Sequence, residues 1–410
     1  MHYIARILRR LRPDVLVFFF GCLAVFAGAF GPLFYLYFHA PSGTQYRFAD
    51  GFFYDYYHYL MKIKSGMMGY WGYYNRFTEI PQPVSYGHAL FPIMGEVSAF
   101  FGLYRPDITY LLSRIGTLAV LFFVFWKSAT KLFSSVVARV SSFVLFFTGT
   151  SGYMILHGQA VEPVTFSGFY NALSKFPAPP QHLLASALLL FAGVYGLTGT
   201  DSAGKRTAVA ISAFVAGMVQ PFIAAVGIAS FFLTAGFWKR ARGPAGMFLA
   251  GSAVPILYYA YLFTHVLPWT IWEKTTLGNN YTVDFLGYLV ANIMYVPFAV
   301  LALLFRKKIS APVFFLLAWG AIVPTVLFPF AKAGALLSMP RLLQVQQYIP
   351  LSLLGGFVCW ELFRPFRKPL RVFILCVFAI FCAGRCRRLL GEQGEKQATS
   401  GSGQKAFDPR

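Results

Sequence analysis

The sequence predicts an all-α protein, a polytopic bundle of transmembrane helices, and three observations lead to this prediction. Hydrophobic residues make up 57% of the 410 residues and charged residues only 12%, which is more apolar surface than a soluble protein hides. The apolar residues are gathered in runs, most of them long enough to cross ~30 Å of hydrocarbon. Most basic residues lie in the short segments between these runs, which is typical of membrane topology.

Ten apolar runs follow one another along the chain. They cover residues 15–38, 107–126, 132–149, 183–199, 207–237, 245–264, 284–305, 311–330, 345–363 and 370–384. The first run has no small-residue cleavage site, so we expect a retained signal-anchor helix. The run 207–237 is too long for one helix and is interrupted at Gln220-Pro221, where proline starts a second helix near the outer surface. About eleven spans result.

The distribution of Lys and Arg predicts a cytoplasmic N-terminus. If 84–104 lies on the outer surface, the cytoplasmic segments carry 17 basic residues and the longer outer segments carry nine. If 84–104 crossed the bilayer, this bias would invert, so we interpret it as interfacial or re-entrant. The last run would leave three arginines outside, so either it is not a full span or the count differs by one. The expected location is a plasma (inner) membrane if the source is bacterial.

The chain divides into a transmembrane domain, residues 1–390, whose first outer loop is 39–106, and a polar tail, 391–410, that is expected to be disordered. The net charge of +21 is explained by the topology signal, so membrane lipid is the expected polyanionic partner and nucleic acid is not. The five cysteines form no CxxC pair, which disfavours a zinc site or disulfide framework. The oligomeric state stays open.

Two carboxylates in the first outer loop are the leading candidates for catalysis. The whole chain has only 14 acidic residues, yet Asp50 and Asp55 lie within six residues of each other, with Tyr54 and His58 alongside. If 51–64 is an interfacial helix, a partly desolvated Asp55 could serve as a general base toward an alcohol. A helix N-cap also accounts for Asp50, and a solvated helix face is the alternative for Asp55.

Several basic residues are candidates for binding a phosphate. Arg114 lies two turns below the outer end of its apolar run, where a charge is expensive and indicates function, although snorkelling also explains it. Lys332 and Arg341 are the basic residues of one outer segment, and Arg341 opens a predicted helix, an arrangement that suits phosphate. An interfacial arginine is the alternative. Arg139, near the cytoplasmic end of its run, is expected to snorkel.

The segment 157–182 contributes further candidates for the substrate cavity. It contains Glu162 and His182, and we expect it to fold over the outer cavity. His182 is equally explained as a residue at the start of a helix.

These patterns together resemble the GT-C superfamily of polytopic membrane glycosyltransferases. Four passages carry the resemblance: DYYHYLMKIKSGMMGYWGYYNRFTE, the segment from Phe166 to His182, Gln220-Pro221-Phe222, and PRLLQVQQYIPLSLL. The resemblance implies an inverting transfer of a sugar from a polyprenyl-phosphate donor on the outer or lumenal face. It also implies that Asp55 deprotonates or orients the acceptor hydroxyl. Arg341, with Arg114 or Lys332, would hold the leaving phosphate.

The chain departs from known members of that superfamily. It has no adjacent acidic pair, no Asp-His-Pro-Pro motif and no Trp-Trp-Asp motif, so the acceptor and any requirement for a divalent metal stay open. Two other functions remain as alternatives. One is a carrier or flippase of a lipid-linked sugar, which predicts internal symmetry and broken helices at mid-membrane. The other is a non-catalytic membrane subunit.

Overall fold

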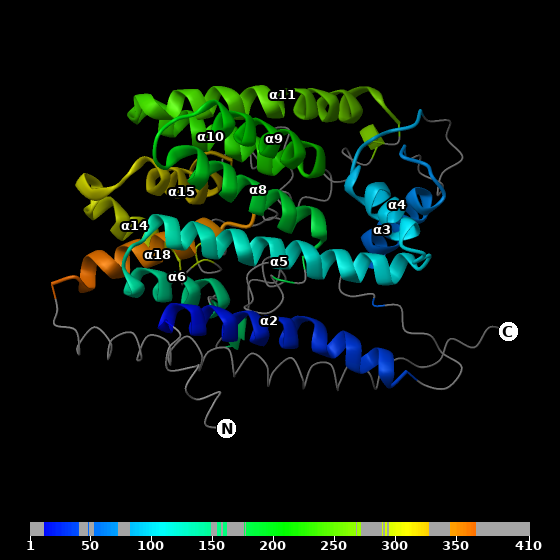
Figure 1. The fold of residues 1–410 in the computed structure, drawn as a ribbon, viewed down its shortest axis with the longest axis horizontal. Helices are drawn as coiled ribbons and strands as arrows, with labels where there is room; N and C mark the ends of the chain where they lie inside the picture. The colour runs from blue at the N-terminus through cyan, green and yellow to red at the C-terminus, as the bar shows by residue number, and fades with distance from the viewer. Residues whose placement is uncertain are drawn as a thin grey trace.

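Long helices lie side by side in the computed structural model, shown in Figure 1. It describes residues 12–40, 48, 53–72, 83–148, 154–156, 159–161, 176, 178–267, 269–271, 289, 292, 295–327 and 345–365. The long and medium helices are α2 (Pro13–Phe38), α3 (Phe53–Met67), α5 (Pro106–Leu132), α6 (Val136–Thr148), α8 (Pro180–Leu197), α9 (Ala203–Val219), α10 (Pro221–Phe237), α11 (Arg242–His265) and α18 (Tyr348–Phe363).

The remaining elements are short. They are α4 (Leu90–Phe100), α14 (Val296–Leu304), α15 (Ala311–Ile322), η1 (Lys239–Ala241), η2 (Arg306–Lys308), η3 (Val323–Leu327) and the strands β1 (Met154–Leu156) and β2 (Gln159–Val161). The two strands form an antiparallel hairpin in which Ile155 pairs with Ala160. Apart from this hairpin, the regular structure of the described residues is helical, as predicted.

Helices occupy ten of the eleven predicted spans within the part of the chain that the structure describes, and the eleventh, 370–384, lies outside it. Four helical segments are long and apolar enough to cross a membrane: Pro13–Phe38, Pro106–Leu132, Pro180–Leu197 and Lys239–His265. The other helices in these runs are shorter. The membrane character of the chain therefore has structural support, and the number of spans stays a prediction.

The break at Gln220-Pro221 is where the sequence predicts it. Gln220 is extended, with φ −154° and ψ 91°, and Pro221 is the first residue of α10. Proline suits this position because the first helical N–H needs no partner within the helix. Pro13, Pro106 and Pro180 begin α2, α5 and α8 in the same way.

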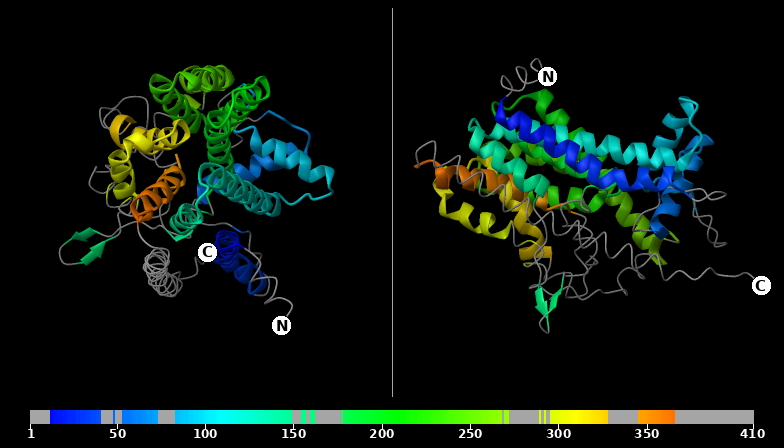
Figure 2. Two further views of the ribbon diagram at one scale, coloured as in Figure 1. Left: turned by 60° about the vertical axis from the view of Figure 1, so that its left-hand side comes forward. Right: turned by 90° about the horizontal axis from the view of Figure 1, so that it is seen from below.

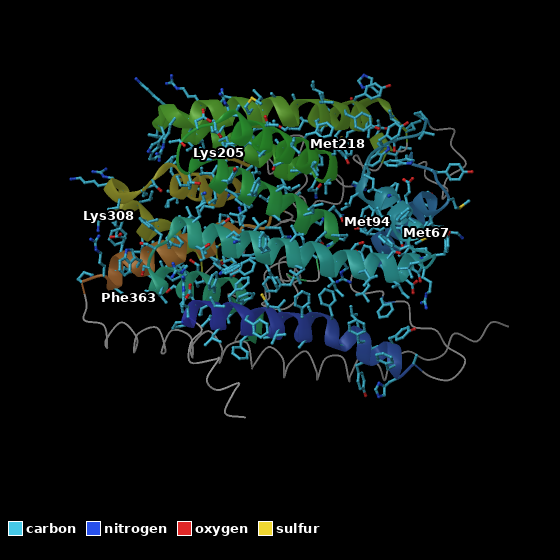
Figure 3. The ribbon with its side chains drawn as sticks, viewed as in Figure 1. Met67, Met94, Lys205, Met218, Lys308 and Phe363 are labelled. Carbon is cyan, nitrogen blue, oxygen red and sulfur yellow. The ribbon has the colours of Figure 1, made fainter. Side chains whose placement is uncertain are left out.

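The segments predicted to be cytoplasmic gather at one end of the bundle. In Figure 3, Lys205, Lys308 and Phe363 lie toward the left end, whereas Met67 of α3 and Met94 of α4 lie at the right. Such an arrangement arises when successive long helices run in opposite directions. The bundle thus has a basic end and an opposite end that carries the first predicted outer loop.

At that opposite end, α3 and α4 form a pair that runs across the long helices, as the right view of Figure 2 shows. A Cβ on Gly66 or Gly95 would fall on the backbone carbonyl of Pro92 or Ile63, so the two helices touch backbone to backbone. With 11 residues, α4 spans only about 16 Å and is too short to cross a bilayer. This length agrees with its interpretation as an interfacial or re-entrant segment.

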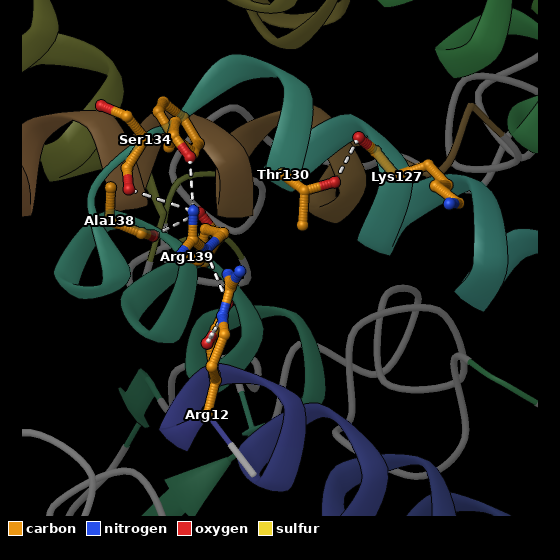
Figure 4. Close-up of polar contacts among 9 residues, drawn as sticks. Arg12, Lys127, Thr130, Ser134, Ala138 and Arg139 are labelled. Atoms are coloured by element: carbon orange, nitrogen blue, oxygen red, sulfur yellow. Dashed lines mark hydrogen bonds and ion pairs between the residues drawn. The ribbon is translucent and has the colours of Figure 1, made fainter. Parts of the chain in front are cut away.

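Arg139 does not snorkel, contrary to expectation. Its Nε donates to Asp14 Oδ2 over 2.6 Å, and its Nη1 donates to the carbonyl oxygens of Phe133 and Ser134. Arg12 donates to the same carboxylate at 2.9 Å (Figure 4). The charge is satisfied inside the protein by a residue of α2, because the packing of α2 against α6 brings that carboxylate within reach.

Candidate functional site

One face of α3 carries three titratable residues, an acid, a phenol and an amine. Asp55, in the first turn, is exposed, which agrees with the alternative of a solvated helix face and not with the expected partial desolvation. Tyr59 and Lys62, one and two turns further, are buried. These spacings place the three residues on the same side of a helix. Because side chains of a helix lean toward its N-terminus, the Lys62 side chain extends back toward His58 and Asp55.

Lys62 is a completely buried amine that contacts a histidine from another segment. Its Nζ lies 2.8 Å from Nδ1 of His88, in the turn before α4, and 5.6 Å from the ring centroid of Trp269. Burial lowers the pKa of Lys62 from 10.5 to about 7, and the Asp55 charge acts in the opposite direction. Near neutral pH, this side chain therefore exists in both protonation states.

His58 lies between Asp55 and Lys62 along α3. Burial, and secondly the Lys62 charge, lower the pKa of His58 to about 3. The imidazole is therefore neutral through the physiological range. As a neutral ring it can both accept and donate one hydrogen bond, and it adds no positive charge beside Asp55.

His88 ties this cluster to the helix bundle. Its backbone is in the left-handed region, with φ 59°, which is unusual for a residue other than glycine. Its N–H donates to Tyr259 Oη of α11 over 2.7 Å. That hydroxyl in turn donates to the carbonyl oxygen of Met218, in the last turn of α9, over 2.9 Å. The conformation of His88 is thus held from both sides.

A second path of hydrogen bonds returns from the bundle to α3. Gln220, at the break between α9 and α10, has Nε2 2.8 Å from Nδ1 of His182 on α8. The neighbouring Gln181 donates from Nε2 to Tyr59 Oη over 3.0 Å. All four side chains are buried. The first path leads from Lys62 to Met218, and the second leads from Tyr59 to Gln220. Together these contacts hold α3 against α8, α9 and α11, and we call them the clamp on α3.

Arg114 lies below an aromatic layer beside α3. Its guanidinium is fully buried and stacks 5.7 Å from the ring centroids of both Tyr110 and Phe30. The Tyr110 ring stacks on Tyr59 at 5.9 Å. The Tyr110 ring therefore lies against both Arg114 and Tyr59 of the α3 cluster, and the Arg114 guanidinium has no exposed surface in this structure.

The structure brings together only part of the predicted site. Asp55, His58 and His182 belong to the α3 cluster and its clamp. Five predicted residues have side chains outside the described part of the chain: Asp50, Tyr54, Glu162, Lys332 and Arg341. Their roles stay predictions, and the same holds for the donor phosphate site as a whole. Among the described residues, no three His, Cys, Asp or Glu side chains are grouped to hold a metal ion.

The sequence does not predict a functional role for Lys62, His88, Gln220 or Tyr259. Lys62 falls in the predicted interfacial helix 51–64, and its place two turns after Asp55 is a signal in itself. Gln220 is predicted only as the site of the helix break. His88 and Tyr259 carry no local pattern that would link them, since 171 residues separate them.

Comparison with known proteins gives no further assignment. No protein-family model, curated protein or solved structure matches this chain.

Proposed function

We propose that the chain is a membrane glycosyltransferase of the GT-C type, which transfers a sugar from a polyprenyl-phosphate carrier to an acceptor hydroxyl at the α3–α4 end of the bundle. One observation carries the proposal. Asp55 is an exposed carboxylate on a short helix that lies across one end of an apolar bundle. A general base that serves a lipid-anchored donor and a water-soluble or membrane-bound acceptor belongs at such a boundary.

The reaction assigns a defined role to Asp55. The acceptor oxygen attacks the anomeric carbon from the side opposite the carrier, and its proton passes to Asp55. The bond between that carbon and the phosphate oxygen breaks, and the electron pair leaves with the polyprenyl phosphate. The attack inverts the anomeric configuration. Asp55 thereby contributes the roughly 100- to 10,000-fold acceleration that is usual for a general base.

The positive groups that receive the leaving phosphate are part of the same proposal. Lys332 and Arg341 are assigned this role, because developing negative charge on phosphate is stabilised by fixed cations. Arg114 is buried against Tyr110 and Phe30. Its proposed role in this structure is therefore to hold these aromatic rings in place and not to contact the phosphate.

The test is a transfer assay with purified protein in lipid nanodiscs. A panel of short-chain polyprenyl phosphates that carry a hexose, a pentose or an N-acetylhexosamine serves as donors, and total membrane extract supplies acceptors. The readout is free polyprenyl phosphate, which is the common product whatever the acceptor. We expect Asp55→Asn to lower the rate by at least roughly 100-fold. The matched control is Glu96→Gln on α4, a carboxylate at the same end of the bundle that should retain activity.

Two results would contradict the proposal. Equal rates for the wild type and Asp55→Asn would remove the assigned base. Movement of a labelled donor across the bilayer without release of polyprenyl phosphate would identify a carrier instead.

A further inference from the structure

The surroundings of Lys62 lead to an inference about how Asp55 is positioned, and this inference rests on the proposed function. Lys62 connects the exposed carboxylate of α3 with the clamp on the bundle. On one side it is coupled electrostatically to Asp55. On the other side it contacts His88 at 2.8 Å, which the backbone bond to Tyr259 holds in place.

A burial of this kind has a clear physical cost. An ammonium group placed in an apolar environment loses its hydration, and the loss is tolerated only when other groups compensate. Here the Trp269 ring, at 5.6 Å, and His88 Nδ1 supply that compensation. An amine needed only for packing would be replaced at lower cost by Met or Leu, so the polar environment built around Lys62 indicates a use for its charge.

We propose that Lys62 is a positioning residue for the transfer reaction: in its protonated form, held by His88, it attracts the Asp55 carboxylate and orients it toward the acceptor. Deprotonation of Lys62 removes this attraction, so transfer is fastest while Asp55 is a carboxylate and Lys62 an ammonium. His88 is then the anchor through which the bundle fixes the position of the ammonium.

Other titratable groups lie on or beside α3. They are Asp55, Tyr56, Tyr57, His58, Tyr59 and Lys64 on α3, His88 before α4, Glu96 on α4, Arg105, Asp107, Tyr110 and Arg114 on or before α5, and Tyr259 on α11. His58 is neutral above about pH 3. Asp107 is paired with Arg105 at 2.6 Å. Asp55 is the group whose negative charge favours protonated Lys62.

The first test requires no enzymatic activity. Because the pKa of Lys62 falls from 10.5 in the unfolded chain to about 7 on folding, the unfolded chain binds one more proton between these values. Stability is therefore lowest below pH 7 and rises as the pH increases from 7 to about 10.5. We expect this rise in the unfolding midpoint of the wild type and of Lys64→Met, an exposed lysine of the same helix, and no such rise in Lys62→Met.

The pH dependence of the unfolding midpoint also tests whether the charges of Lys62 and Asp55 interact. In Asp55→Asn the favourable charge is lost, so the rise begins at a lower pH than in the wild type. In a Lys62→Met background, Asp55→Asn has no pH-dependent effect over this range. Because Asp55 is exposed, Asp55→Asn is expected to fold and keeps the test available even if Lys62→Met does not accumulate. Additive effects of the two substitutions at every pH would overturn the inference.

The second test uses the transfer assay. We expect the wild-type rate to fall by up to about tenfold for each pH unit above about pH 7, until it reaches the rate of Lys62→Met, whereas Lys62→Arg, which stays protonated, retains its rate at alkaline pH. In Lys62→Met, the acidic limb of the profile moves to higher pH. Coupling in the stability test without any transfer would contradict the proposed function alone. Transfer with an unchanged profile in all variants would contradict the role of Lys62 alone.

Discussion

The Nε atom of Arg139 lies 2.6 Å from Oδ2 of Asp14, 125 residues earlier in the chain. The Asp14 side chain is 0% exposed and that of Arg139 is 7% exposed. The pair joins the first turn of α2 to the first turns of α6 (Figure 4). Since each buried charge depends on the other, this ion pair fixes the first helix against the bundle at its basic end.

Removal of one partner of this pair should destabilise the protein strongly. We expect Asp14→Ala to lower the free energy of unfolding by about 3–5 kcal/mol, because it leaves Arg139 buried without its carboxylate. The matched control is Asp201→Ala, which removes the ion pair with Arg206, where the charged atoms lie 3.8 Å apart and both side chains are about half exposed. It should cost no more than about 1 kcal/mol.

Thermal or denaturant unfolding of the protein in detergent measures both variants. The double variant Asp14→Leu with Arg139→Met tests the cause. It should recover most of the loss, since the isolated charge and not the missing bond is the dominant cost. Equal losses in Asp14→Ala and Asp201→Ala would show that the pair does not fix α2.

The close approach of α3 and α4 leads to a second prediction. Because a Cβ on Gly66 would fall on the Pro92 carbonyl, Gly66→Ala should force the two helices apart and cost about 1–3 kcal/mol. The resulting shift of α3 should also lower the transfer rate. Gly116→Ala is the control, because nothing lies within 4 Å of its Cβ position on α5; helix propensity alone should make it about 1 kcal/mol more stable.

Unfolding midpoints and the transfer assay together separate these effects. A Gly66→Ala variant with wild-type stability and rate would mean that the α3–α4 contact is not required. Gly95→Ala, whose Cβ would fall on the Ile63 carbonyl from the other helix, should behave in the same way.

Local patterns in the sequence were sufficient to predict the helices but not their partners. The break at Gln220-Pro221 is predictable because proline and an interrupted apolar run act within a few residues. The pairing of Arg139 with Asp14, and of Lys62 with His88, was not predictable. A buried charge requires compensation, but which group supplies it depends on how helices far apart in the chain pack. Snorkelling was therefore the wrong expectation for Arg139.

The same reasoning gives the sharpest prediction for the clamp on α3. The Tyr259 hydroxyl accepts from the His88 N–H and donates to the Met218 carbonyl, so Tyr259→Phe leaves both groups without it. Both bonds are part-buried, so each group left unsatisfied costs at most about 1–3 kcal/mol. The neighbouring Tyr258 accepts from the N–H of the exposed Tyr86, where water can replace the lost hydroxyl, so Tyr258→Phe should cost much less.

Hydrogen exchange provides the measurement that separates a local loss from a global one. If the clamp holds α3, Tyr259→Phe should speed amide exchange over residues 53–67 and 83–100 more than over α5, and Tyr258→Phe should not. Because the clamp positions Lys62 through His88, Tyr259→Phe should also lower the transfer rate, whereas Tyr258→Phe should leave it near that of the wild type. Uniform exchange changes across the bundle would mean that Tyr259 stabilises the whole protein and does not specifically hold the α3–α4 pair.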